Sequence, residues 1–223
     1  MLILTIGSLL TLVELALPAG TAKQVVFVAF ALACAAMVAL GARSQRPPGL
    51  GGWYLIALAQ AVWVVGGVLA ATVGGLVPAL LELSAYLVAA AGVETLTRTR
   101  KARRDLVSTL DSAILVVATT MVAWVFVIAP AWHDGSGAER VVAVTLPVVS
   151  IVIFAALVRF AYAPGAARAT RVAVMVGLGA LLGYQAATPG RTVALLDVGA
   201  RGPTDLWLVA LTAAAAVASH PRM

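Results

Sequence analysis

Three carboxylates set within apolar sequence are the residues of this chain whose type and position could do chemistry. Glu14, Glu82 and Asp111 each interrupt a long apolar run. A charge near the centre of a bilayer costs at least about 2.5–3.5 kcal/mol, so it is seldom kept without a partner. These carboxylates could line a polar pocket, relay protons or pair with arginines of a basic loop. The alternative, equally weighted for Glu14 and Glu82 and favoured for Asp111, is that each reaches water or a helix N-terminus.

Deep tryptophans are a second kind of candidate. Trp63, Trp124 and Trp207 lie well inside apolar runs. Packing is the first explanation for them, and a flat hydrophobic sensor pocket would use the same residues. Other aromatic side chains fall at the ends of runs, as in the interfacial belt of a membrane protein: Trp53, Tyr54, Trp132 and Tyr162.

Patterns for enzymatic or metal chemistry are missing from the sequence. His133 and His220 each stand alone, with no HExxH motif. No GxSxG, Walker or GxGxxG motif occurs. Cys34 is the single cysteine, so it can form no intrachain disulfide, and a small buried apolar residue is its favoured interpretation. We therefore expect no catalysis, no cofactor and no metal site.

The densest charge in the chain is a basic cluster made of Arg98, Arg100, Lys101, Arg103 and Arg104. It could bind anionic lipid head groups or an acidic partner, at no more than about 1 kcal/mol per basic side chain. The favoured alternative is a topology anchor that holds the loop inside the cell. Nucleic acid is not expected as a partner, because no aromatic residues alternate with these charges to stack on bases.

The elements that must position these residues are membrane-spanning helices. Of the 223 residues, 62% are hydrophobic and 11% are charged, and the mean hydropathy is +1.04, which nearly excludes a soluble protein. The apolar runs are long and show no period-two alternation, so strands are not expected. Counted against about 20 residues per crossing, the runs predict an all-α, polytopic integral membrane bundle of eight helices. The predicted spans are 2–17, 24–42, 53–73, 77–97, 106–130, 141–162, 169–187 and 204–219.

The breaks between the runs are short turns rich in glycine and proline, so residues 1–223 are predicted to form one transmembrane domain. Pro78 and Pro147 are expected in the first turns of their helices, where a proline loses no hydrogen bond.

The basic residues orient the predicted bundle. Eleven of the 15 fall on the loops of one face and four on the other. The positive-inside rule then predicts an inner-membrane protein with both termini in the cytoplasm. The first span could instead be a cleaved signal peptide, but it lacks a basic start and contains Glu14, so cleavage is the less favoured alternative.

Small residues at four-residue spacing predict close helix packing. Gly67, Ala71 and Gly75 form one stripe in the third span, next to a stripe of Gly66, Ala70 and Gly74, and Gly179 and Gly183 form a GxxxG in the seventh. Packing within one chain is favoured over a homodimer, which stays an alternative.

Several short motifs resemble the N-terminal membrane module of actinobacterial GGDEF/EAL cyclic di-GMP signalling proteins. They are Glu82, Tyr86 and Gly92, the basic loop, Leu110-Asp111, the stretch Trp124 to Pro130, Asp205-Leu206-Trp207 and the final His220 to Met223. The resemblance implies a sensory input module, and it adds Tyr86 to the pocket candidates. Such modules often carry an aspartate after glycine in the third span, whereas this chain reads Val64-Val65-Gly66-Gly67-Val68, and no GGDEF or EAL motif is present.

A faint internal match, Glu82-Leu83 against Asp205-Leu206, suggests two four-helix units in the same orientation. The function predicted from the sequence is thus a membrane sensory module without catalysis, coupled to cyclic di-GMP turnover domains after Met223 or to a partner chain. The bilayer is the other expected partner. The alternatives are a small ion-coupled transporter, which the carboxylates keep open, and a scaffold that assembles a partner in the membrane.

Overall fold

The computed structural model describes residues 21–73, 76–100, 137–161, 172–177 and 203–218, and single positions between 114 and 129. The described part is helical apart from short turns and contains no strand. Five helices are complete enough to bound: α2 (Thr21–Gln45), α3 (Leu50–Thr72), α4 (Leu76–Arg100), α7 (Gly137–Ala161) and α9 (Pro203–Ala218). Their ends lie within four residues of the predicted ones.

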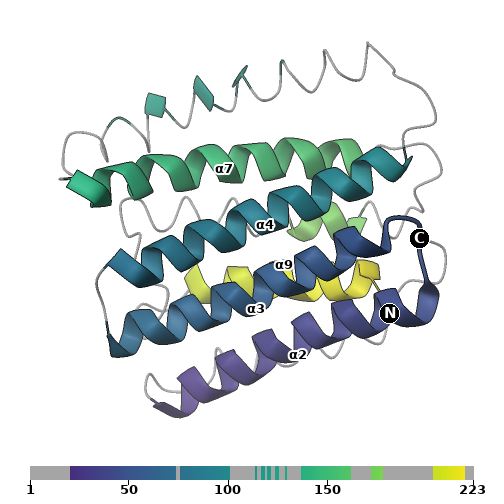
Figure 1. Ribbon diagram of the computed structural model, residues 1–223, viewed down its shortest axis with the longest axis horizontal. Coiled ribbons are helices and arrows are strands. Elements are labelled where there is room, and N and C mark those ends of the chain that lie inside the picture. Colours follow the sequence, from purple (N-terminus) through teal and green to yellow (C-terminus); the bar gives the residue numbers. More distant parts are fainter. Residues whose placement is uncertain are drawn as a thin grey trace.

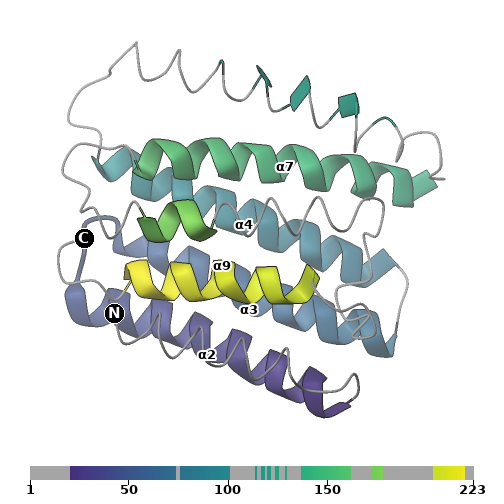
Figure 2. The same ribbon diagram turned by 180° about the vertical axis from the view of Figure 1, so that it is seen from behind.

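The helices form a layered bundle. In Figure 1, α2, α3, α4 and α7 lie side by side in that order. The contacts follow the same order, from α2 to α3, from α3 to α4 and from α4 to α7. Figure 2 shows α9 across the back of this layer, where it packs against α2. A second layer therefore covers the inner sides of the first.

The outer sides of the helices are as apolar as the inner sides. Val25, Leu40, Leu58, Val77 and Leu80 are each at least half exposed. A helix that is apolar all round belongs in a protein core or in lipid. Three described helices are long and apolar enough to cross a membrane: Thr21–Gln45, Leu50–Ala70 and Leu76–Thr99. Membrane association follows from these three, and the count of eight stays a prediction.

The turn between α2 and α3 shows how the chain reverses. Arg46 and Gly49 have φ values of +45° and +79°, and the intervening Pro47 and Pro48 cannot continue a helix. The Gly52 N–H donates to the Gly49 carbonyl at 2.8 Å, which starts α3 immediately. A Cβ at Gly49 would lie 2.8 Å from Thr99 Oγ1, so this turn rests on the last turn of α4.

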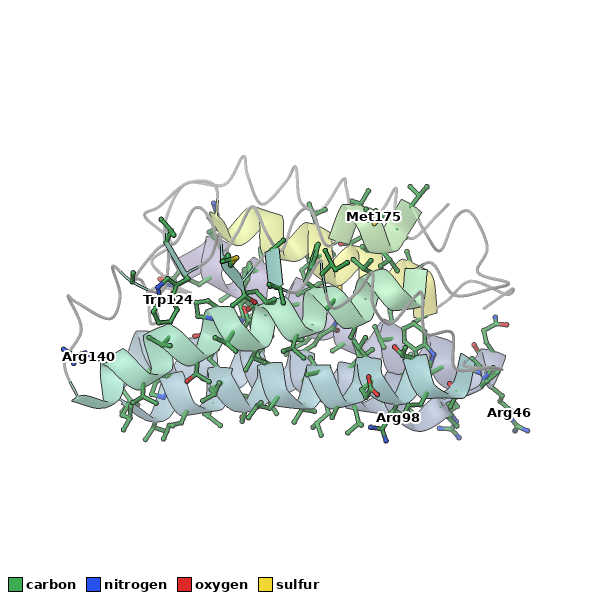
Figure 3. The ribbon with its side chains drawn as sticks, turned by 90° about the horizontal axis from the view of Figure 1, so that it is seen from above. Arg46, Arg98, Trp124, Arg140 and Met175 are labelled. Atoms are coloured by element: carbon green, nitrogen blue, oxygen red, sulfur yellow. The ribbon has the colours of Figure 1, made fainter. Side chains whose placement is uncertain are left out.

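The contact between the α2–α3 turn and the last turn of α4 places basic residues of both helices at one end of the bundle. Arg43 and Arg46 close α2, and Arg98 lies in the last turn of α4. In Figure 3, Arg46 and Arg98 lie toward the same end, and Arg140 lies at the opposite end. We call the first end, marked by Arg43, Arg46 and Arg98, the basic end. These four described arginines lie at the ends to which the sequence assigned them, whereas the full division of the 15 basic residues and its assignment to the cytoplasm remain predictions.

The two helix prolines differ in position. Pro78 is the third residue of α4, in its first turn as predicted. Pro147 lies inside α7, ten residues after Gly137, so the prediction of a first-turn proline was wrong there. The helix begins four residues before the predicted span, because the boundary was drawn from apolar residues and the first turn of α7 carries Glu139 and Arg140. An interior proline removes a backbone hydrogen bond and favours a kink.

Candidate functional site

A buried carboxylate in α4 is the most unusual polar group of the described spans. Glu82 is 6% exposed, although Leu80 and Leu87 on the outer side of the same helix are half exposed. The side chain of Trp63 of α3 lies beside it. The Trp63 ring packs against Phe27 of α2, with ring centroids 6.0 Å apart and an interplanar angle of 56°. Glu82 of α4, Trp63 of α3 and Phe27 of α2 therefore follow one another across three helices.

Next to this group lies a cavity of about 170 Å³. Its walls come from α3, α4, α7, residues 172–177 and α9, so parts of the chain far apart in sequence meet there. The lining residues are Trp53, Ile56, Ala59, Gln60, Trp63, Ala85, Tyr86, Ala89, Val93, Leu96, Ile153, Leu157, Ala173, Val174, Gly177, Ala210, Leu211, Ala213, Ala214 and Val217. Nearly all of them are apolar, so the cavity favours an apolar occupant.

One side chain in the wall breaks this apolar character. Gln60 is 7% exposed, and its Oε1 is buried without a hydrogen-bond partner among the described residues. Gln60 lies midway along the candidate span Leu50–Ala70, about 15 Å of helix from either end. A buried carbonyl without a partner costs about 1–3 kcal/mol. One residue of the cavity wall therefore carries a costly, unsatisfied acceptor at the mid-depth of a candidate span, and that oxygen is closed off from the cavity as well as from solvent.

Three aromatic side chains share the cavity wall with Gln60. Trp53, Trp63 and Tyr86 all line the cavity and are each at most 3% exposed. Trp53 was expected in an interfacial belt; it does lie near the end of α3, but its side chain is buried inside the bundle. Its neighbour Tyr54 is 42% exposed, as a belt residue should be. Flat rings in an apolar wall suit a flat, mostly apolar molecule.

The structure brings some predicted site residues together and separates others. Glu82 and Tyr86 lie one turn apart on α4, and Tyr86 lines the cavity. Trp124 is 57% exposed and does not line the cavity. Trp207 belongs to α9, but its side chain is outside the described part. Glu14 and Asp111 also lie outside the described residues, so their roles stay predictions.

The predicted basic cluster is described only at its start. Arg98 forms an exposed ion pair with Glu94 one turn earlier, with 2.8 Å between Nε and Oε1. Arg100 ends α4, and Lys101, Arg103 and Arg104 lie outside the described residues. An exposed pair of this kind adds little to stability.

Glycines join α3 to α4 along a seam that the sequence identified only in part. A Cβ at Gly52 would lie 2.7 Å from the Gly92 carbonyl oxygen, and one at Gly92 would lie 2.9 Å from that of Gly52. A Cβ at Gly66 would approach Leu81 Cβ to 3.3 Å. We call Gly52, Gly66 and Gly92 the glycine seam. Gly66 belongs to one predicted stripe and packs within the chain.

The other predicted stripe residues are less fully described. Gly67 is buried in α3, Ala71 lies in the same helix, and Gly75, Gly179 and Gly183 lie outside the described residues. Neither this nor the glycine seam tests the homodimer.

The sequence interpretation missed Gln60 as a site residue. The available signal was an amide at the centre of the run Leu55-Ile56-Ala57-Leu58-Ala59-Gln60-Ala61-Val62, which contains no charge. Among the described residues, no group of three or more His, Cys, Asp or Glu could hold a metal ion. The described residues therefore offer an apolar cavity and no constellation for catalysis.

No protein-family model, curated protein or solved structure matches this chain.

Proposed function

We propose that this protein is a membrane-embedded sensory input module that controls cyclic di-GMP turnover domains or a partner chain and has no catalysis of its own. The observation that carries the proposal is the cavity, because its wall is shared between α9 and the α3–α4 pair. An occupant of the cavity contacts both parts at once. It can therefore favour one packing of α9 over another, provided that it binds the two packings with different affinity.

The composition of α9 suits a helix that shifts. Its centre reads Thr212-Ala213-Ala214-Ala215-Ala216, so it buries little apolar area per residue. Against α2, Thr212 is the side-chain hydrogen-bonding neighbour of Cys34. Ala213 packs closely on Gly177, where an added Cβ would lie 3.2 Å away. Because these side chains are small, α9 can shift along its neighbours without a large side chain having to leave a pocket.

The proposed output, control of cyclic di-GMP turnover, is based on the resemblance to the membrane module of GGDEF/EAL proteins. Two residues that carry it fall in places with a clear packing role: Tyr86 lines the cavity, and Gly92 belongs to the glycine seam. A sensory module of that kind passes its signal through the helix that precedes the catalytic domains. In this chain α9 is the helix in that position.

A chimera tests the proposal. Residues 1–223 are joined at Met223 to a GGDEF synthase domain, and cyclic di-GMP synthesis is measured in isolated membranes. Ala89→Leu fills the cavity from α4 and should change the synthesis rate at least about twofold, because RT ln 2 is a small fraction of a typical coupling free energy. Ala91→Leu, the same change on the exposed side of α4, should leave the rate unaltered. Equal rates in all three proteins would reject the sensory function.

A small ion-coupled transporter is the second candidate, and the burial of Glu82 in a candidate membrane span is the observation that favours it. A carboxylate there is a typical element of a proton or cation pathway. The test is ion-driven counterflow in proteoliposomes. A carrier should show flux in the wild type that Glu82→Gln removes, whereas a sensory module should show no flux in either protein.

A further inference from the structure

A groove near the C-terminal end of α2 combines positive charge with apolar surface. Its lining residues are Met37, Leu40, Gly41, Arg43, Ser44 and Arg46, and we call it the α2 groove. We propose that the α2 groove binds one anionic phospholipid, with the phosphate held by the side chains of Arg43 and Arg46 and an acyl chain along Met37 and Leu40. This inference goes beyond the proposed sensory function and does not depend on it, since the groove shares no residue with the cavity.

The groove lies where a membrane-spanning α2 leaves the hydrocarbon. The candidate span Thr21–Gln45 has 25 residues, or roughly 37 Å of helix, so its end turns reach beyond about 30 Å of hydrocarbon into the head-group layers. Arg43 lies in the last turn, and Arg46 follows it. Leu40 and Met37 lie about 4.5 Å and 9 Å deeper along the helix than Arg43. Charge at the interface above apolar surface is the order that a phospholipid requires.

The apolar half of the groove is open to the surroundings of the bundle. Helix α2 lies at one edge of the layer formed by α2, α3, α4 and α7 (Figure 1), and Leu40 is 63% exposed. Gly41 has no side chain, which leaves the helix surface low between Met37, one turn earlier, and Ser44, one turn later. In a bilayer, exposed apolar surface of this kind contacts acyl chains.

The polar half carries two positive charges that no described carboxylate neutralises. Arg43 and Arg46 are exposed, and neither has an ion-pair partner among the described residues. In Figure 3, the Arg46 side chain points away from the bundle. The fork of N–H donors on a guanidinium group matches phosphate oxygens. A lipid with a net negative charge fits better than a zwitterionic one, whose cationic group would lie beside two arginines.

The backbone at Arg46 indicates that this side chain is kept at a cost. Among the described residues, Arg46 is the non-glycine residue with a positive φ, +45°. Its N–H donates to the Ala42 carbonyl at 3.0 Å and closes the end of α2, in a position that glycine commonly occupies. Glycine would make the same bond with less strain and without the charge. Backbone strain at one residue is a typical sign of a functional side chain.

The experiment measures lipid preference by native mass spectrometry of the full chain in a neutral detergent. Phosphatidylglycerol and phosphatidylcholine with identical acyl chains are the probes, and the preference is the ratio of their association constants. Arg43→Gln and Arg46→Gly should each lower the preference about fivefold, which corresponds to the attraction of one basic side chain for an anionic head group.

The matched control is Arg98→Gln, which removes the same unit of charge at the same end of the bundle. Arg98 does not line the α2 groove, and it already pairs with Glu94. At about 0.15 M ammonium acetate, salt screens charges that do not contact the lipid, so the preference should change less than about twofold. Equal losses in all three variants would overturn the site, because net charge alone would then explain them. A wild type without any preference would overturn it as well.

Thermal stability in the same detergent without lipid separates lipid binding from a structural role of Arg46. Arg46→Gly should melt at or above the wild-type temperature, since glycine adopts a positive φ without strain. Stability that rises or stays equal while lipid preference falls supports the site. A lower melting temperature would overturn the role of Arg46 in the groove.

A soluble competitor tests whether the ligand is a lipid or only its phosphate. Glycerol 3-phosphate carries the phosphate and lacks the acyl chains, so at equal concentration it should not displace phosphatidylglycerol. Displacement would overturn the assignment to a lipid.

Discussion

Between α3 and α4 the chain packs backbone against backbone, whereas the side of the same helix pair that faces α9 encloses a cavity of about 170 Å³. The seam consists of glycines with no side chain to separate the helices. The cavity wall combines three large rings with several alanines, whose small side chains leave the space between the helices unfilled. In lipid, no hydrophobic force closes such gaps, and fit between surfaces decides where helices approach. Close packing and an internal cavity can therefore lie within one helix pair.

The largest expected effect is on the glycine seam. Gly92→Leu places a side chain where even a Cβ would lie 2.9 Å from the Gly52 carbonyl oxygen, and a backbone atom cannot move aside cheaply. We expect a loss of about 3 kcal/mol in the free energy of unfolding. Unfolding in sodium dodecyl sulfate, followed by circular dichroism, measures it.

Gly51→Leu is the control for the seam. A Cβ at Gly51 meets no atom within 4 Å, so its unfolding free energy should stay within about 0.5 kcal/mol of the wild type. If Gly92→Leu behaved like Gly51→Leu, the α3–α4 contact would not be a tight one.

A smaller, opposite effect is expected at the cavity. Ala89→Leu adds apolar atoms to an empty space and should raise the unfolding free energy by about 1 kcal/mol. Ala91→Leu faces outward and should change it by less than about 0.5 kcal/mol. The same detergent titration compares the two. A destabilising Ala89→Leu would mean that the cavity wall cannot accept more volume.

The smallest effect is expected at the basic end. Glu94→Ala removes the carboxylate that pairs with Arg98, but Arg98 is 76% exposed and water screens the pair. The unfolding free energy should fall by less than about 0.5 kcal/mol, and the difference should vanish in high salt. Titrations at low and high ionic strength test this. A loss of more than about 1 kcal/mol in the free energy of unfolding would show that this ion pair stabilises the fold more than an exposed pair normally does.

The helices were predictable because lipid imposes a simple requirement on sequence. A span must satisfy its own backbone hydrogen bonds and present apolar side chains over about 30 Å, and α2, α3 and α4 follow that rule all round. For the same reason, the sequence could not say which side of each helix faces inward. Trp53 and Tyr54 are neighbours of similar character, yet one is buried and the other is exposed.

The site was less predictable than the helices. Glu82 and Tyr86 were recognised and lie beside or in the cavity, but Gln60 was passed over because an uncharged amide is a weak signal within a 23-residue helix. Gln60 was recognised only as part of a cavity wall, and no sequence pattern marks the position of a cavity. It depends on residues from α3, α4, α7, 172–177 and α9 at once.

The amino-acid sequence by itself determined the long apolar helices of a membrane protein, the proline and glycine turn between α2 and α3, and the arginines at the basic end, because each of these follows from local chemistry and the solvent around the chain. Only the tertiary structure decided that Gly52 meets Gly92, that Trp63 faces Glu82 and that Gln60 borders a cavity. Those relations depend on how side chains of different helices fit together in space, and van der Waals fit is a property of pairs of surfaces that no single stretch of sequence contains.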